Sequence, residues 1–278
     1  MKTVVITTDY SDFAKHAARY GLRFGQSLGA DRFILYHAFE VPTIMAEVPV
    51  SEWEHQKEYK ESIEKLEELK AYISAYAHPE TKIDIVANSL NLLAGIERLT
   101  GVNNASLVVA GSSGKSNFAK FFLGTSTKVL MKSLSTPLLI VPPDIDFGNI
   151  DRIVFACDIK HALKTTPVQL LKHMTENLEA RLSVVNVEPE NKPAEADMVK
   201  VQEDLQKLLA GVPTDIHFIR DRNPAEGILH FSQKNEAKLV VAVARSYSFL
   251  EKVFHRSVTQ KLSEVSEVPL LITRLKTK

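Results

Sequence analysis

The sequence has little cysteine, no net charge and no long apolar run, and each absence excludes a class of protein. Its one cysteine, Cys157, cannot form an internal disulfide and suits a reducing cytosol. The 34 basic residues balance the 34 acidic ones, so no excess charge favours a nucleic-acid or membrane partner. No apolar run approaches the roughly 20 residues of a transmembrane helix, and the first residues lack the apolar segment of a signal peptide. The expected location is the cytoplasm.

A recognisable catalytic constellation is missing as well. Ser113 and Ser116 have no visible partners for a nucleophilic triad, and Asp9 lacks the neighbouring acids of a phospho-acceptor site. His37 has no cysteine, histidine or carboxylate at metal-ligand spacing and is interpreted as a half-buried structural residue. No general base is evident, so we expect a protein that is not an enzyme, or at most a slow ATPase.

Short apolar segments with strand and helix character alternate along the first half of the chain. Strands are expected at residues 3–8, 32–39, 82–87, 107–110 and 138–141. Helices are expected at residues 12–28, 52–76, 90–99 and 126–133, with an extended loop at 41–51. In the 52–76 helix the inner side is expected to carry Ile63, Leu66, Leu69 and Ile73, and the acid–base pairs of residues 52–70 form a solvated face. This alternation predicts a parallel sheet with helices on both faces.

The second half of the chain repeats this order. Residues 153–158 mirror 4–9, and residues 268–273 mirror 136–141. Further matching strands are expected at 180–187, 215–220 and 238–244. The offset falls from 149 (158 − 9) to 132 (269 − 137), so the second copy is shorter. The repeat predicts two tandem domains, 1–145 and 150–278, each a doubly wound, Rossmann-like parallel sheet of five strands.

Glycines and hydroxyl residues gather after the fourth strand of the first half. That strand ends at Ala110 and Gly111, Gly114 and Gly124 follow, and residues 125–127 (Thr-Ser-Thr) open a helix. Glycine lets a backbone approach a ligand closely, and a helix N-terminus attracts anions. Hydroxyl groups add donors for phosphate oxygens. The stretch predicts a phosphate cradle, with a tight turn before an ordinary capped helix as the alternative.

The spacing of these residues resembles the nucleotide-binding pattern of the universal stress proteins, here in tandem form. Gly111, two residues, Gly114, nine residues and Gly124-Thr125 match it, as do residues 126–130 (STKVL) and 135–141 (STPLLIV). The resemblance implies an adenine nucleotide alpha-hydrolase-like fold that binds ATP or AMP, with or without Mg²⁺.

The resemblance also assigns roles to residues. The base and ribose end is expected to meet Thr7, Thr8, Asp9 and Ala38. The phosphate end is expected to meet Ala110, Gly111, Gly114, Gly124, Thr125, Ser126 and Thr127. Asp9 would serve equally well as the N-cap of the first helix, and the two roles can coexist.

The second half has lost the cradle. Ala244 and Arg256 stand where Gly111 and Gly124 stand in the first half, and the connection between them is filled by Tyr247, Phe249 and Leu250. Larger side chains occupy the space that a phosphate would use. We therefore expect the first domain alone to bind nucleotide, and leave open whether Arg256 holds another anion.

Two functions of different kinds follow. One is a nucleotide-binding regulatory protein of the stress response; the other is a nucleotide-free interaction module whose cradle is a relic. The retained glycines favour the first, because the second half shows what replaces them. By the resemblance, the last strands of the two domains are expected to pair as an internal pseudo-dimer, and whether two chains then form a homodimer is left open.

Overall fold

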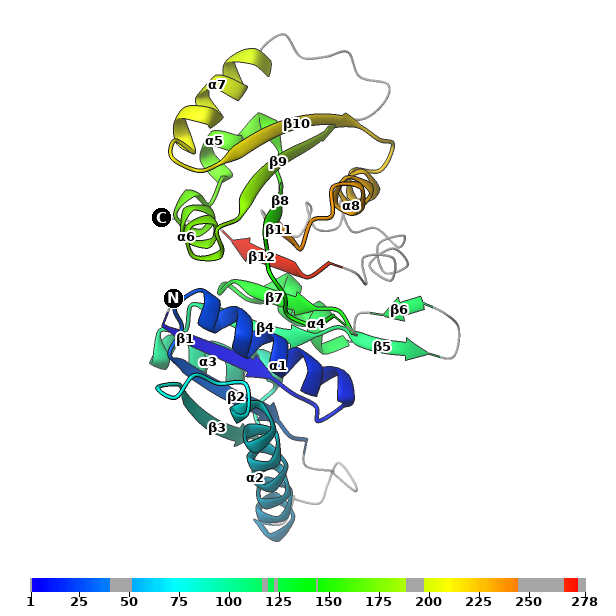
Figure 1. Ribbon diagram of the computed structural model, residues 1–278. Helices are drawn as coiled ribbons and strands as arrows, with labels where there is room; N and C mark the ends of the chain where they lie inside the picture. The colour runs from blue at the N-terminus through cyan, green and yellow to red at the C-terminus, as the bar shows by residue number, and fades with distance from the viewer. Residues whose placement is uncertain are drawn as a thin grey trace. The chain divides into compact units, whose positions relative to one another are not determined.

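A computed structural model describes residues 2–40, 52–116, 120–122, 125–143, 145–188, 198–244 and 268–274 (Figure 1). The described parts of residues 1–112 and 124–144 form one compact unit, and those of 113–123 and 145–278 form a second. The expected loop at 41–51 and the residues Gly124, Tyr247, Phe249, Leu250 and Arg256 lie outside the described ranges. No helix in the described ranges is long and apolar enough to cross a membrane.

The first unit is built around five parallel strands in the order β3-β2-β1-β4-β7. The strands are β1 (Thr3–Thr7), β2 (Arg32–Ala38), β3 (Lys82–Asn88), β4 (Leu107–Gly111) and β7 (Leu138–Val141). The helices are α1 (Asp12–Ser27), α2 (Glu52–Ser74), α3 (Leu92–Asn103) and α4 (Thr125–Ser133). Between β4 and α4 the chain forms an antiparallel hairpin that the sequence did not predict, β5 (Ser113–Ser116) and β6 (Lys120–Phe122), whose residues are grouped with the second unit.

The second unit repeats this sheet, in the order β10-β9-β8-β11-β12. Its strands are β8 (Arg152–Ala156), β9 (Arg181–Glu188), β10 (Thr214–Arg220), β11 (Leu239–Ala244) and β12 (Leu270–Arg274). Its helical segments are a 3₁₀ turn (Ile159–His161), α5 (Ala162–Thr165), α6 (Val168–Leu178), α7 (Met198–Leu208) and α8 (Pro224–Lys234). The predicted fold class, two tandem parallel-sheet α/β domains, is confirmed.

Helices cover both faces of the first sheet, as two residues of β2 show. Phe33 and Tyr36 are three positions apart, so their side chains lie on opposite faces. A Cβ added at Gly25 of α1 would lie 2.6 Å from a ring carbon of Phe33. A Cβ added at Gly95 of α3 would collide with the Tyr36 hydroxyl. These two glycines let α1 and α3 approach the sheet from opposite sides.

The third helix begins and ends later than the sequence predicted. The Asn91 side chain accepts a hydrogen bond from the Ala94 N–H at 3.0 Å, which makes Asn91 the N-cap and Leu92 the first helical residue. The helix then continues to Asn103, and Asn104 ends it with a φ of 49°. Capping, rather than apolar spacing, decides where this helix begins.

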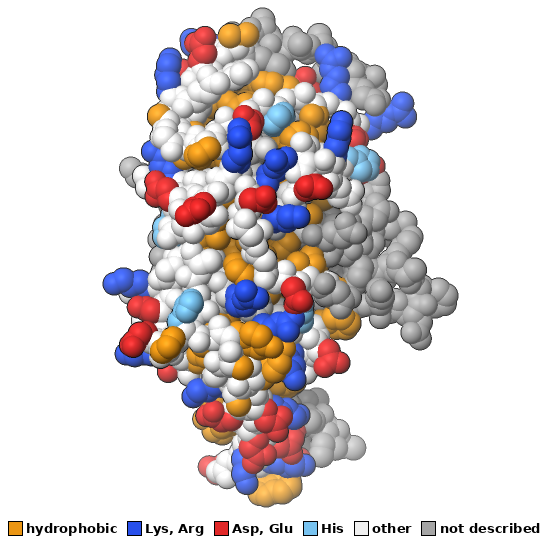
Figure 2. Space-filling model, in the orientation of Figure 1, with side chains coloured by type: hydrophobic (Ala, Val, Ile, Leu, Met, Phe, Trp, Pro, Cys, Tyr) orange, Lys and Arg blue, Asp and Glu red, His pale blue; other side chains and the backbone are white. Residues whose placement is uncertain are grey.

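The long helix α2 presents the charged face that the sequence predicted. Lys57 pairs with Glu61, and Lys60 with Glu64, each at 3.9 Å and four residues apart. The buried side includes Ser62 together with Leu66, Leu69 and Ile73, whereas Ile63 is only half-buried. Figure 2 shows acidic and basic side chains interspersed over the described residues of the visible face.

Candidate functional site

The carboxyl ends of three neighbouring strands meet at one edge of the first sheet. β1 lies between β2 and β4, with Thr7 opposite Tyr36 and Ile6 opposite Val109. From β1 the chain builds β2 and β3 on one side and then β4 on the other, so the strand order reverses here. Open α/β sheets bind their ligands at such a switch point. The predicted residues at or directly after these strand ends are Thr7, Thr8, Asp9, Ala38, Ala110 and Gly111.

The two threonines at the end of β1 use their hydroxyls within the protein. Thr7 Oγ1 donates to the Val109 carbonyl at 3.1 Å and so joins β1 to β4 at the switch point. Thr8 Oγ1 accepts from the Tyr10 N–H at 2.9 Å. Both side chains are buried, while Ala38 at the end of β2 is half-buried. Thr7 and Thr8 therefore shape this edge mainly by holding its backbone.

Asp9 is exposed, and it supports a helix cap without being the cap itself. Its Oδ1 accepts from the Ser11 N–H at 3.0 Å and from the Ser11 hydroxyl at 2.5 Å. Ser11 Oγ in turn accepts from the Ala14 N–H at 3.2 Å, so Ser11 is the N-cap of α1. The expectation that Asp9 caps the helix is corrected in this respect. No protein donor in the described ranges is bonded to its second oxygen, Oδ2.

One hydrogen bond joins the two sides of the predicted cradle. The Thr127 hydroxyl donates to the Gly111 carbonyl at 3.1 Å, which fixes the first turn of α4 against the end of β4. Thr127 is buried, whereas Thr125 and Ser126 are exposed. The hydroxyls that face solvent at the helix N-terminus are therefore those of Thr125 and Ser126, and Thr127 has a structural role.

Two glycines of the predicted cradle, Gly111 and Gly114, lie in different surroundings. A Cβ at Gly111 would lie 3.2 Å from the Phe13 carbonyl oxygen and 3.4 Å from Ala17 Cβ. Glycine at this strand end is thus explained in part by close packing against α1. Gly114 lies in the hairpin strand β5.

His37 has the structural role that the sequence predicted. Its Nδ1 lies 2.7 Å from the Thr8 carbonyl oxygen, and because a carbonyl can only accept, Nδ1 carries the hydrogen. Burial lowers the pKa of His37, with a smaller contribution from Lys65, while the bond to Thr8 and the charge of Asp9 oppose the shift. The neutral ring packs 4.3 Å, centroid to centroid, from the ring of Tyr10.

The second sheet has the same edge with different side chains. The Cys157 N–H donates to the Val185 carbonyl at 2.9 Å, just as the Thr8 N–H donates to the Tyr36 carbonyl at 3.0 Å. The next loop differs, because Asn186 Oδ1 accepts from the Ile159 N–H at 3.2 Å where the chain enters its 3₁₀ turn.

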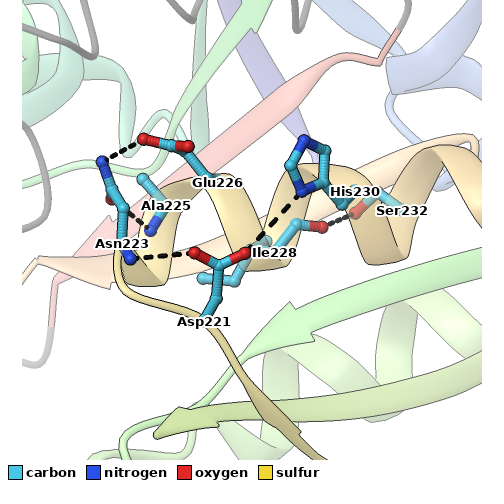
Figure 3. Close-up of polar contacts among 7 residues, drawn as sticks. All are labelled: Asp221, Asn223, Ala225, Glu226, Ile228, His230 and Ser232. Atoms are coloured by element: carbon cyan, nitrogen blue, oxygen red, sulfur yellow. Dashed lines mark hydrogen bonds and ion pairs between the residues drawn. The ribbon is translucent and has the colours of Figure 1, made fainter. Parts of the chain in front are cut away.

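A polar cluster at the start of α8 is a capping network (Figure 3). Asn223 caps the helix by accepting from the Ala225 N–H at 3.0 Å, and its amide donates to Glu226 at 2.7 Å. Asp221 accepts from the Asn223 N–H at 2.9 Å and lies 3.7 Å from His230 Nδ1. Throughout the described ranges, no group of three His, Cys, Asp or Glu residues is arranged to hold a metal ion.

Sequence reasoning missed one residue of the first edge, Tyr10. Its φ is 65°, its hydroxyl donates to the carbonyl of Ser62 in α2, and its ring contacts His37. The only available signal was its place next to Asp9, because a sequence pattern does not report the backbone conformation of a tyrosine.

Comparisons with known proteins agree with the repeat and the fold. The sequence model of the universal stress protein family matches residues 1–142 and again 149–274. A universal stress protein of Synechocystis sp. is 22% identical over 300 residues, covering 99% of this chain and all of the relative. One of Methanocaldococcus jannaschii is 23% identical over 145 residues, covering 50% of this chain and 81% of the relative. The crystal structure of a universal stress protein from Archaeoglobus fulgidus shares the fold, with a TM-score of 0.76, 16% identity and 98% coverage of both chains.

Proposed function

We propose a regulatory or signalling role in the stress response for this chain, with ATP or AMP bound in its first domain. The proposal starts from the family, because the chain belongs to the universal stress proteins. The observation that carries this proposal is the bond between Thr127 and the Gly111 carbonyl, which holds a helix N-terminus beside a strand end at the switch point. Such a helix end offers unpaired N–H groups and positive potential to an anion.

The two ends of a nucleotide find different chemistry along this edge. The exposed hydroxyls of Thr125 and Ser126 at the start of α4 suit phosphate oxygens. The exposed carboxylate of Asp9, at the end of β1, suits hydroxyl or amino donors of the ribose and base. This arrangement supports an orientation with the phosphates at α4 and the base toward β1 and β2.

A comparison of the cradle residues in the two halves of the chain favours one nucleotide site per chain. Ala244, which replaces Gly111, is buried at the end of β11, and Arg256 replaces Gly124 in the sequence. Two tandem domains of one family also fit an internal pseudo-dimer. That pairing, and any further homodimer, stay predictions.

A charge placed in the cradle tests the proposal. Ser126→Asp puts a carboxylate in the first turn of α4. The helix dipole stabilises a negative charge there, so the helix should be kept, but the charge repels phosphate. We expect calorimetric titration of nucleotide-free protein, with and without Mg²⁺, to show ATP binding to the parent that weakens about tenfold or more in the variant, a loss of about 1.4 kcal/mol. The neutral Ser126→Asn is the matched control: it replaces the hydroxyl with an amide that can still donate to phosphate, so it should weaken ATP binding much less than Ser126→Asp does.

Two results would count against the proposal. Equal ATP affinity in Ser126→Asp and the parent would place the phosphates elsewhere. A parent that binds neither ATP nor AMP at millimolar concentration, while its circular dichroism spectrum is that of a folded α/β protein, would favour the nucleotide-free interaction module.

A further inference from the structure

Tyr10 has a backbone conformation that is uncommon for a bulky residue. Four described non-glycine residues have positive φ: Tyr10 (65°), Asn104 (49°), Glu179 (52°) and Glu236 (52°). The last three follow helices α3, α6 and α8, where a left-handed residue commonly ends a helix. Tyr10 precedes a helix and directly follows Asp9. Residues held in such sparsely populated backbone conformations cluster at functional sites, and the positive φ of Tyr10 is therefore a candidate functional feature.

Four contacts hold Tyr10 in place. Its N–H donates to Thr8 Oγ1 at 2.9 Å, and its hydroxyl donates to the carbonyl of Ser62, a buried residue of α2, at 3.0 Å. Its ring lies 4.3 Å from that of His37, and the Lys65 ammonium lies 5.4 Å from its ring centroid, within the range of a cation–π contact. Burial raises the pKa of Tyr10 to about 12, so the hydroxyl keeps its proton at neutral pH.

These contacts fix the backbone on the carboxyl side of Asp9. On the amino side, the Thr8 N–H is bonded to the Tyr36 carbonyl at 3.0 Å, and the Thr8 carbonyl accepts from His37. Asp9 thus lies between two anchored residues, and its Oδ1 is held by Ser11. The Asp9 side chain is exposed, so its carboxylate is held by the two bonds from Ser11 and by the anchored backbone on either side of it, which includes the turn at Tyr10.

The second domain lacks this arrangement. Ile159 stands at the position of Tyr10, 149 residues further on (159 − 10), and begins a 3₁₀ turn. Its N–H is bonded to Asn186, and isoleucine has no hydroxyl to reach a helix. The tyrosine therefore accompanies the domain with the intact glycine pattern and is absent from the one that has lost it.

We infer that Tyr10 is a positioning residue of the nucleotide site: its hydroxyl, bonded to Ser62 of α2, holds the Asp9 carboxylate where the base and ribose end of an adenine nucleotide would bind. The inference rests on the proposed function. Tyr10 acts through Asp9, so it does not need to touch the nucleotide itself.

A double-mutant cycle on ATP affinity tests this inference. Tyr10→Phe removes only the hydroxyl, and Asp9→Asn removes the charge while keeping an oxygen for Ser11. Calorimetric titration of the full chain with ATP should show about fivefold weaker binding in Tyr10→Phe, the factor that one net hydrogen bond provides. In the Asp9→Asn background, Tyr10→Phe should change the affinity less than twofold, because the group that it positions is already altered. Tyr59→Phe is the control: it removes the hydroxyl of a half-exposed tyrosine in α2, and this variant should bind ATP as the parent does.

The outcomes separate the inference from the proposed function. Unchanged affinity in Tyr10→Phe, or the same loss with and without the Asp9→Asn substitution, would overturn the inference while leaving nucleotide binding intact. A parent that does not bind ATP would overturn both. A fivefold loss that vanishes in the Asp9→Asn background would support Tyr10 as a positioning residue, since a general weakening of the fold would lower both affinities alike.

Discussion

At the scale of single residues, the predicted site divides into groups that are already bonded and groups that are exposed. The hydroxyls of Thr7, Thr8 and Thr127 hold strands and loops together, whereas Asp9, Thr125 and Ser126 face solvent. The bonded threonines give the exposed residues fixed positions. A ligand at this edge would thus meet a preorganised backbone and would contact few side chains.

The buried imidazole of His37 makes folding stability depend on pH. Its pKa in the folded protein lies below the ordinary value of 6.5, so below that pH the unfolded chain binds a proton that the folded protein resists. The free energy of unfolding should therefore fall as the pH drops from about 7 through the pKa of His37 in the folded protein. His37→Asn keeps an N–H donor for the Thr8 carbonyl and should show a smaller fall in urea denaturation at about pH 7 and pH 5. An equal fall in this variant and in the control His78→Asn, an exposed histidine, would contradict the assignment.

The sequence predicted the membership of this edge better than its bonding. Asp9 and Gly111 follow from the strand ends and the glycine spacing, and Ala38 from the family resemblance; all three lie near one edge because parallel strands bring their carboxyl ends together. The sequence offered Asp9 as the N-cap of α1, and this was wrong, because the side chain that accepts from the Ala14 N–H is that of Ser11. The left-handed residue Tyr10 is bonded to α2, more than fifty positions away in the sequence, and no local pattern reports that contact.

At the scale of elements, the approach of each helix to the sheet depends on small residues at the contact. α3 contains two glycines with opposite surroundings: Gly95 faces the Tyr36 hydroxyl, and Gly101 has no atom within 4 Å of an added Cβ. The sequence predicted the helix but not this difference, because Tyr36 and Gly95 meet only in the folded sheet. The N-cap at Asn91 likewise gave α3 a different start from the one that apolar spacing suggested.

The two glycines provide a matched pair of substitutions. Gly95→Ala should lower the free energy of unfolding by about 1–3 kcal/mol, because the new methyl group collides with Tyr36. Gly101→Ala should raise it by up to about 1 kcal/mol, because alanine is the better helix former and meets no neighbour. Urea denaturation of both variants measures the two effects. A destabilised Gly101→Ala, or a Gly95→Ala as stable as the parent, would show that the packing of α3 is described wrongly.

At the scale of the whole molecule, the chain contains the same fold twice, and only the first copy carries the glycine pattern of Gly111, Gly114 and Gly124. The two sheets share their strand order, and the corresponding bonds of Thr8 and Cys157 show that the repeat extends to the loops. The sequence predicted this duplication because buried parallel strands are conspicuous apolar runs. It did not predict the β5–β6 hairpin, whose strands lack such a run.

We propose a single nucleotide site, located in the first domain, and the stoichiometry of ATP binding tests this proposal most directly. Calorimetric titration of the nucleotide-free protein should give one ATP per chain. Gly124→Arg, which introduces the residue that the second half carries as Arg256, should abolish that binding while the far-ultraviolet circular dichroism stays that of the parent. Two sites per chain, or undiminished binding in Gly124→Arg, would contradict the claim.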